Sequence, residues 1–211
     1  MKIRVCRKWV VVLVVSTPLM ILVGLSWAAQ FTAETTIDQL GQKQKVKLYV
    51  KGQKMREETV DVFGQKQILI TGPGKGQTFI LYPETRTYTP LPAATAQSPI
   101  GQDEEALKKI GIRRKIGQED LNGYLCDKYE IAFHNKYRGK MIVWVARKLD
   151  YPIQMIQVDG PPIGAVDRKL TSIKEEDLDD SLFRVPDDYR RIKPPAQGGC
   201  GLNLVCTVKF Y

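Results

Sequence analysis

The stretch that decides the fold is Lys45-Val46-Lys47-Leu48-Tyr49-Val50-Lys51-Gly52-Gln53-Lys54-Met55-Arg56. Apolar and polar side chains alternate along its first half. Successive side chains of a β-strand point to opposite faces, so this alternation is typical of a strand with one buried face. Lys51-Gly52 then supplies a turn, and Met55 continues the apolar face beyond it. The stretch therefore predicts a β-hairpin with one apolar face.

The same kind of pattern recurs along most of the chain. Short stretches rich in Val, Ile, Tyr, Phe and Thr are separated by turns that contain Gly, Pro or Asn. The connections are too short for crossover helices, so neighbouring strands are expected to pair antiparallel as a single meander. The predicted strands are Phe31–Ile37, Lys45–Val50, Lys54–Val60, Gln67–Thr71, Gln77–Tyr82, Arg86–Thr89, Ile112–Ile116, Tyr124–Ile131, Gly139–Ala146, Pro152–Val158 and Lys169–Lys174.

Helix is scarce, and the sequence predicts a mostly β protein with minor α content. Asp103–Ile110 is the clearest helical stretch, because acidic residues begin it and Lys108 and Lys109 end it. A second short turn is predicted at Leu178–Phe183. Some strands, such as Met141–Val145, are apolar on both faces. Such a strand lies either in a filled core or along an apolar cavity, and composition alone leaves both alternatives open.

The N-terminus has the pattern of a secretory signal peptide. Four basic residues precede an apolar run from Trp9 to Leu25, and Ser26 and Ala28 suit cleavage after Ala28. An uncleaved anchor helix is the alternative. Three regions are therefore expected: a signal peptide over 1–28, a folded domain over 29–192, and a Pro- and Gly-rich tail over 193–211.

Cleavage would leave a weakly basic protein with three cysteines. The whole chain carries 32 Lys and Arg against 23 Asp and Glu, and removal of four basic residues lowers the net charge from +9 to 28 − 23 = +5. The basic residues alternate with apolar ones, which indicates a solvated face rather than a nucleic-acid surface. In an oxidising compartment Cys200–Cys206 is the easiest disulfide, with Cys126 as the alternative partner for either.

No stretch has the pattern of a catalytic, metal or cofactor site. His134 lies in a turn without a matched partner, and Cys200 and Cys206 lack nearby His ligands for a metal. The Gly-rich residues 72–78 lack phosphate-loop spacing and precede a strand instead of a helix. We therefore expect no enzyme, no metal and no cofactor.

Several segments resemble, in the same order, those of the LolA-like family of periplasmic lipoprotein carriers and related exported proteins of unassigned function. The likeness covers roughly residues 31 to 192. The segments that carry it are Lys47–Arg56, Ile68–Gly72, Gln77–Pro83, Gly123–Tyr129, Trp144–Ala146, Tyr151–Ile153 and Leu182–Tyr189.

The resemblance implies an antiparallel sheet curled into a half-open, unclosed β-barrel, with one or two short helices over its concave face. It also implies an apolar pocket for acyl chains. LolA carriers start with a long amphipathic helix, whereas this mature chain would start with a strand. They carry an Arg where Gly52 stands here, so no functional residue is transferred from the family.

Two functions remain as hypotheses. The first is a periplasmic, monomeric carrier that shelters a lipid or the acyl chains of a lipoprotein, without stable membrane insertion after cleavage. The second is an envelope interaction or sensor domain of the same fold, which binds a protein partner while its concavity is filled. The candidate lining residues of the pocket are Leu48, Val50, Met55, Ile68, Ile70, Phe79, Leu81, Trp144 and Met155.

The first prediction concerns processing. N-terminal sequencing of the exported protein should begin at Ala29, or within a residue or two of it, because the small residues before that position suit signal peptidase. Recovery of an intact Met1 in a membrane fraction would instead indicate an anchored domain.

Overall fold

The computed structural model describes residues 29–39, 42–60, 64–72, 78–91, 104–159 and 167–193. The predicted signal peptide and the tail that contains Cys200 and Cys206 lie outside these residues, so their boundaries and the disulfide stay predictions. In the described part of the chain, no helix is both long enough and apolar enough to cross a membrane.

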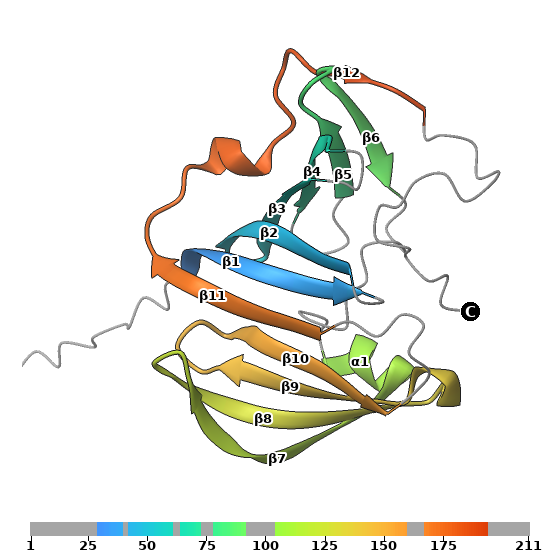
Figure 1. Ribbon diagram of the computed structural model, residues 1–211, viewed down its shortest axis with the longest axis vertical. Helices are drawn as coiled ribbons and strands as arrows, with labels where there is room; N and C mark the ends of the chain where they lie inside the picture. Colours follow the sequence, from blue (N-terminus) through green and yellow to red (C-terminus); the bar gives the residue numbers. More distant parts are fainter. Residues whose placement is uncertain are drawn as a thin grey trace, which may run out of the picture.

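Within the described ranges, twelve strands form one sheet in the order β12-β6-β5-β4-β3-β2-β1-β11-β10-β9-β8-β7 (Figure 1). All neighbours pair antiparallel except β12 and β6. The strands are β1 Gln30–Gln39, β2 Gln42–Lys51, β3 Lys54–Val60, β4 Lys66–Thr71, β5 Thr78–Tyr82, β6 Thr87–Leu91, β7 Gly111–Leu121, β8 Tyr124–Phe133, β9 Lys140–Ala146, β10 Tyr151–Asp159, β11 Asp167–Glu175 and β12 Arg190–Arg191. Since the two ends of the sheet do not pair with each other, the barrel stays open, and the predicted fold class is confirmed.

Local sequence accounts for these elements. Buried and exposed residues alternate along β1 and β2, as the period of a one-sided strand requires. The β7–β8 hairpin turns at Asn122-Gly123, where both residues have positive φ angles of 52° and 80°. These angles suit a two-residue hairpin turn, in which Asn and Gly are the favoured residues.

The sheet curls strongly toward one face. Glu57 of β3 and Arg168 of β11 form an ion pair with a 2.7 Å contact, although β2 and β1 lie between their strands. Likewise, the Tyr151 hydroxyl of β10 lies 3.6 Å from the Met55 sulfur of β3. Neighbouring strands are about 4.8 Å apart, so such contacts require a curved sheet. We call the face that carries Glu57 and Met55 the concave face, and the opposite face the outer face.

The main apolar cluster joins the two halves of the sheet. Phe31 stacks edge-on against Tyr151, with ring centres 5.3 Å apart. The buried members of the cluster come from β1, β2, β8, β9, β10, β11 and the β9–β10 turn: Phe31, Ala33, Leu48, Val50, Cys126, Trp144, Ala146, Leu149, Ile153 and Leu170. Strands on both sides of β1 thus share one core.

The predicted helix is present as α1, Glu104–Ile110. Its Leu107 is buried in a second cluster with residues of β8, β9 and β10, among them Phe133, Val143 and Met155. A 3₁₀ turn, η2 (Lys136–Arg138), lies between β8 and β9.

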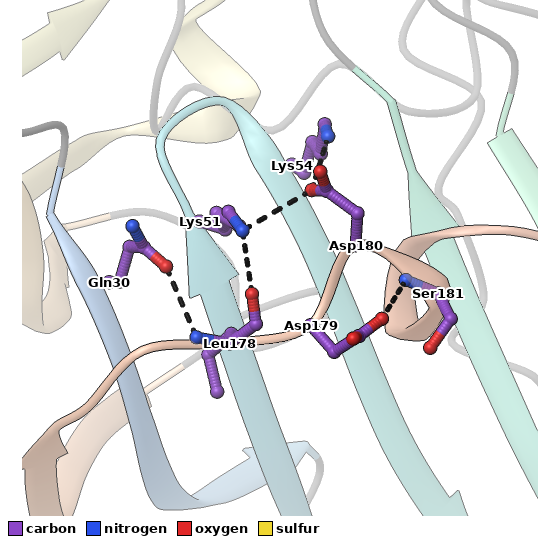
Figure 2. Close-up of polar contacts among 7 residues, drawn as sticks. All are labelled: Gln30, Lys51, Lys54, Leu178, Asp179, Asp180 and Ser181. Atoms are coloured by element: carbon purple, nitrogen blue, oxygen red, sulfur yellow. Dashed lines mark hydrogen bonds and ion pairs between the residues drawn. The ribbon is translucent and has the colours of Figure 1, made fainter.

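The chain after β11 crosses the outer face. This outer segment, residues 176–183, ends in the 3₁₀ turn η3, Asp180–Phe183, within the predicted turn at Leu178–Phe183. Lys51 donates a 2.6 Å hydrogen bond to the Leu178 carbonyl, and Lys54 pairs with Asp180 at 2.8 Å (Figure 2). Alternate residues of a strand point to opposite faces. Lys51, Lys54 and Arg56 therefore point away from the concave face, because they are next in sequence to its residues on β2 and β3. Since η3 contacts these side chains, it lies on the outer face.

The second prediction concerns the start of β7. A Cβ atom on Gly111 would lie only 2.6 Å from the Ala132 carbonyl oxygen, whereas one on Gly117 meets nothing within 4 Å. Gly111→Ala should therefore lower the free energy of unfolding by about 1–3 kcal/mol, as overpacking does. Urea unfolding curves measure this difference.

Gly117→Ala is the matched control on the same strand and should change the free energy of unfolding by less than about 1 kcal/mol. Equal effects of the two substitutions would contradict the close approach of β7 and β8 at Gly111.

Candidate binding site on the concave face

The concave face carries an ionic pair within apolar surroundings. The side chains of Arg168 and Glu57 are only 13% and 15% exposed. Glu57 lies opposite Leu48 on β2 and Leu69 on β4, which are apolar. Removal of such charges from water costs several kcal/mol per ion, which their mutual attraction only partly offsets. Stability alone therefore does not explain the pair.

Electrostatic effects keep Arg168 charged. Burial opposes the charge on Arg168, but the neighbouring Glu57 carboxylate outweighs this effect, so the pKa of Arg168 is raised above its usual value. Burial also raises the pKa of the Tyr151 hydroxyl, which stays protonated. The concave face therefore presents a fixed guanidinium cation beside a neutral phenol.

The concave face also holds polar atoms without hydrogen-bond partners. Glu57 Oε1 and Arg168 Nη2 lie 2.7 Å apart and are each other's partner. In the part of the chain that the structure describes, four other buried side-chain atoms lack a hydrogen-bond partner: Thr59 Oγ1, Thr78 Oγ1, Thr89 Oγ1 and Arg168 Nε. Each unsatisfied buried group costs about 1–3 kcal/mol.

All four atoms belong to one face of the sheet. Thr59 follows Glu57 by two residues on β3, so both side chains point the same way. Directly paired residues of neighbouring strands share a face of the sheet. Pairing places Thr89 on the face of Glu57, through Ile80 and Leu69. It likewise places Thr78 on the face of Met55, through Thr71. The buried polar atoms without a protein partner are thus concentrated on the concave face.

The predicted lining residues fall on both faces of the sheet. Leu48 and Val50 belong to the main cluster with Trp144, Met55 packs against it, and Met155 lies in the cluster around α1. The remaining four lie on the outer face, because Ile70 is paired with Arg56 and Phe79, and Ile68 with Glu58 and Leu81. The structure therefore brings together Leu48, Val50 and Met55, but separates them from Ile68, Ile70, Phe79 and Leu81. Trp144 belongs to the same cluster, but its cross-strand row, through Gln154 and Lys169, is that of the outer face.

The outer face has a polar groove of about 490 Å³. Strands β1 to β4 contribute charged side chains of both signs to it, including Glu34, Lys45, Lys47, Glu58 and Lys66. Apolar residues such as Val60 and Ile68 also line it, so the groove has a mixed lining.

Cys126 behaves as a core residue. It is fully buried in the main cluster, its thiol donates a 3.3 Å hydrogen bond to the Tyr124 carbonyl, and burial raises its pKa. A thiol with a raised pKa is a weak nucleophile. Within the described residues, no group of His, Cys, Asp and Glu side chains is arranged to hold a metal ion.

The sequence analysis missed Glu57 and Arg168. A signal for Glu57 exists, because the alternation of β3 places this charge between Met55 and Thr59 on the apolar face. Arg168 has no such signal, since its partner is distant in the sequence. Only the curl of the sheet brings the two together.

Comparisons with known proteins agree with this fold. A family model described as "Domain of unknown function (DUF4412)" matches residues 30–151. No curated protein matches the chain. A crystal structure of an uncharacterized conserved protein from Thermus thermophilus is similar with a TM-score of 0.55 and 13% identity, over 80% of this chain and 93% of that one.

Two further solved structures have related folds. In the Pseudomonas aeruginosa MucA/MucB complex, a chain is similar with a TM-score of 0.51 and 12% identity, over 77% of this chain but only 58% of that one. The LolA superfamily protein NE2245 from Nitrosomonas europaea has a TM-score of 0.41 and 13% identity, over 74% and 90% of the two chains. The expected LolA-like fold is confirmed by the match to MucB, whose TM-score is 0.52.

The third prediction concerns the buried ion pair. Glu57→Leu leaves the Arg168 charge buried without its partner and should lower the free energy of unfolding by about 3–5 kcal/mol. The double variant Glu57→Leu/Arg168→Met removes both charges and should recover most of this loss. Chemical denaturation of the wild-type protein, the two single variants Glu57→Leu and Arg168→Met, and the double variant measures the coupling.

Glu58→Leu is the control, because Glu58 pairs with Arg56 on the outer face and is 34% exposed. It should cost at most about 1 kcal/mol. Additive effects of Glu57→Leu and Arg168→Met would show that the two side chains do not interact.

Proposed function

The chain belongs to the DUF4412 family, whose function is unknown, and we propose that it is an exported, non-enzymatic binding protein that shelters a lipid or the acyl chains of a lipoprotein. The proposed site is the concave face of the half-barrel. The observation that carries the proposal is the curl that joins β3, β10 and β11 across the strands between them.

A curled sheet offers an apolar guest contacts on several sides. Leu48, Val50 and Met55 on one half of the sheet share a cluster with Trp144 and Ile153 on the other. A chain that inserts between these halves loses contact with water along its whole length. The gain is about 0.8 kcal/mol for each methylene sheltered, and this mechanism needs no catalytic group.

The proposal includes the place of action. The signal-like N-terminus supports export to the periplasm, with a protein that is soluble and monomeric after cleavage. The cargo is then an acylated molecule that crosses the aqueous space between two membranes. The proposed role is transport or storage of that molecule.

A second function is partner binding with a filled concavity. Two observations favour it: Phe31, Leu48 and Leu170 are already fully buried, and a similar chain occurs in the MucA/MucB complex. The polar outer groove would then serve as the contact surface. Uptake of an apolar probe separates the two functions.

The fourth prediction tests acyl-chain binding. A fluorescent fatty-acid analogue should bind the protein and be displaced by phospholipid or by an acylated peptide. Leu69→Glu places a carboxylate on the concave face beside Glu57 and should weaken probe binding at least tenfold, because an unpaired buried charge is costly. Fluorescence titration and a thermal melt measure binding and folding together.

Ile68→Glu is the matched control, since Ile68 is the neighbouring half-buried residue and points to the outer face. It should leave probe binding unchanged. Failure of the wild-type protein to bind the probe would replace the carrier function by the partner-binding one, and equal losses in both variants would exclude the concave face as the site.

A further inference from the structure

We propose that the protein forms a reversible homodimer in which the β7 strands of two copies pair antiparallel through their open edges. Two strand edges of this length make a small interface, so the dimer dissociates readily on dilution. The inference goes beyond the proposed function and does not depend on it, because the monomeric carrier is the dissociated form of the same protein.

Strand β7 is an open edge of the sheet. It lies at one end of the strand order and, among the described residues, pairs with β8 alone. One side of this 11-residue strand therefore offers its backbone N–H and C=O groups to a further strand. Every residue from 112 to 116 is exposed, and the large apolar side chains of Ile112 and Ile116 are 65% and 43% exposed. Such an edge favours association with another strand.

The order of charges along β7 indicates which strand fits this edge. The first half of β7 carries Arg113, Arg114 and Lys115, and the second half carries Glu119 and Asp120. An antiparallel second copy reverses this order, so the basic half of each strand lies beside the acidic half of the other. A parallel copy would instead place like charges side by side, which is destabilising. The strand is therefore complementary to itself in the antiparallel orientation that a two-fold axis generates.

A β-bulge at Ile116 makes this pairing possible. Strands β7 and β8 pair regularly on both sides of Ile116, which is the extra residue of the bulge. Arg113 and Asp120 are seven positions apart, so in a regular strand their side chains would point to opposite faces. Their partners Ile131 and Leu125 are six positions apart on β8 and share a face. Because of the bulge, Arg113 and Asp120 therefore lie on one face of the sheet.

The bulge also specifies the register of the dimer. Arg114 and Glu119 share the other face, since their partners Glu130 and Cys126 are four positions apart on β8. Directly paired residues of neighbouring strands share a face of the sheet. One antiparallel register meets this condition and pairs opposite charges: Ile112 with Leu121, Arg113 with Asp120, and Arg114 with Glu119.

Contacts within one copy are compatible with this register. Arg114 pairs with Glu130 at 3.1 Å, yet 71% of its side chain is exposed. Glu119 pairs with Lys128 at 3.2 Å and is 45% exposed. Both side chains can therefore contact a second copy without losing their partners on β8. The dimer would extend each of these ion pairs into a longer row of alternating charges.

Sedimentation equilibrium of the wild-type protein tests the dimer. The mean mass should rise from that of a monomer to that of a dimer as the protein concentration is raised from micromolar to millimolar. Arg113→Glu should raise the Kd about tenfold, because it turns both Arg113–Asp120 pairs of the symmetric dimer into repulsive ones. Asp120→Arg should weaken association by a similar factor for the same reason.

A mixture of the two variants separates this interface from a folding defect. In a mixed dimer of Arg113→Glu with Asp120→Arg, each of the two cross-strand positions again holds one acidic and one basic side chain. The equimolar mixture should therefore associate about as tightly as the wild-type protein. Lys45→Glu is the matched control, since Lys45 is an exposed residue of the interior strand β2. It should change the Kd by less than about twofold.

A wild-type protein that stays monomeric throughout would overturn the inference and leave the β7 edge to an extended segment of another protein. A mixture that associates no better than its two components would overturn the pairing of β7 with itself. The fatty-acid probe can be titrated into each variant, so loss of the dimer and loss of the carrier function are measured separately.

A second measurement needs no variant. Amide hydrogen exchange within residues 112–121 of the wild-type protein should slow as the dimer forms, because the second copy accepts hydrogen bonds from the N–H groups that point away from β8. Exchange in β12, at the other end of the sheet, should stay the same. A dimer that leaves exchange in β7 unchanged would overturn the inference.

Discussion

The curvature of the sheet is the constraint on which the rest of the structure depends. Contacts between β3 and β10 or β11 exist only because the strands between them bend toward the concave face. The same bend places residues of β2 and β8 in one apolar cluster. A flat sheet of this width would expose these residues on one side, so the curl takes the place of a second layer.

The two faces of the sheet carry different kinds of polar interaction. On the outer face, segment 176–183 is attached by lysine contacts to Leu178 and Asp180, and the charges are near solvent (Figure 2). On the concave face, charges and hydroxyl groups are withdrawn from solvent without full hydrogen bonding. The outer face thus holds its covering segment by exposed polar contacts, whereas the concave face holds a buried ion pair and buried hydroxyl groups.

Most of the fold could be predicted from the sequence because its signals are local. Alternation along Lys45–Val50 and the Asn122-Gly123 turn each specify structure within a few residues. The faces of β4 and β5 could not be predicted in this way. Both faces of Ile68-Leu69-Ile70 are apolar, and alternation does not reveal that Ile68 and Ile70 share the face on which η3 packs against the neighbouring strand β3. The Glu57–Arg168 pair was missed for the same reason, since it depends on curvature.

The position of β1 has a consequence for the order of folding. This first strand lies in the middle of the sheet, between β2 and β11, and Thr32 bonds to Glu176 at a sequence separation of 144 residues. Such distant pairing slows folding, because the long loop must close before the contact forms. During folding, β1 and β2 can pair early but keep an open edge until β11 is in place. An unpaired edge invites association with other chains, so this interval is when the protein is most exposed to aggregation.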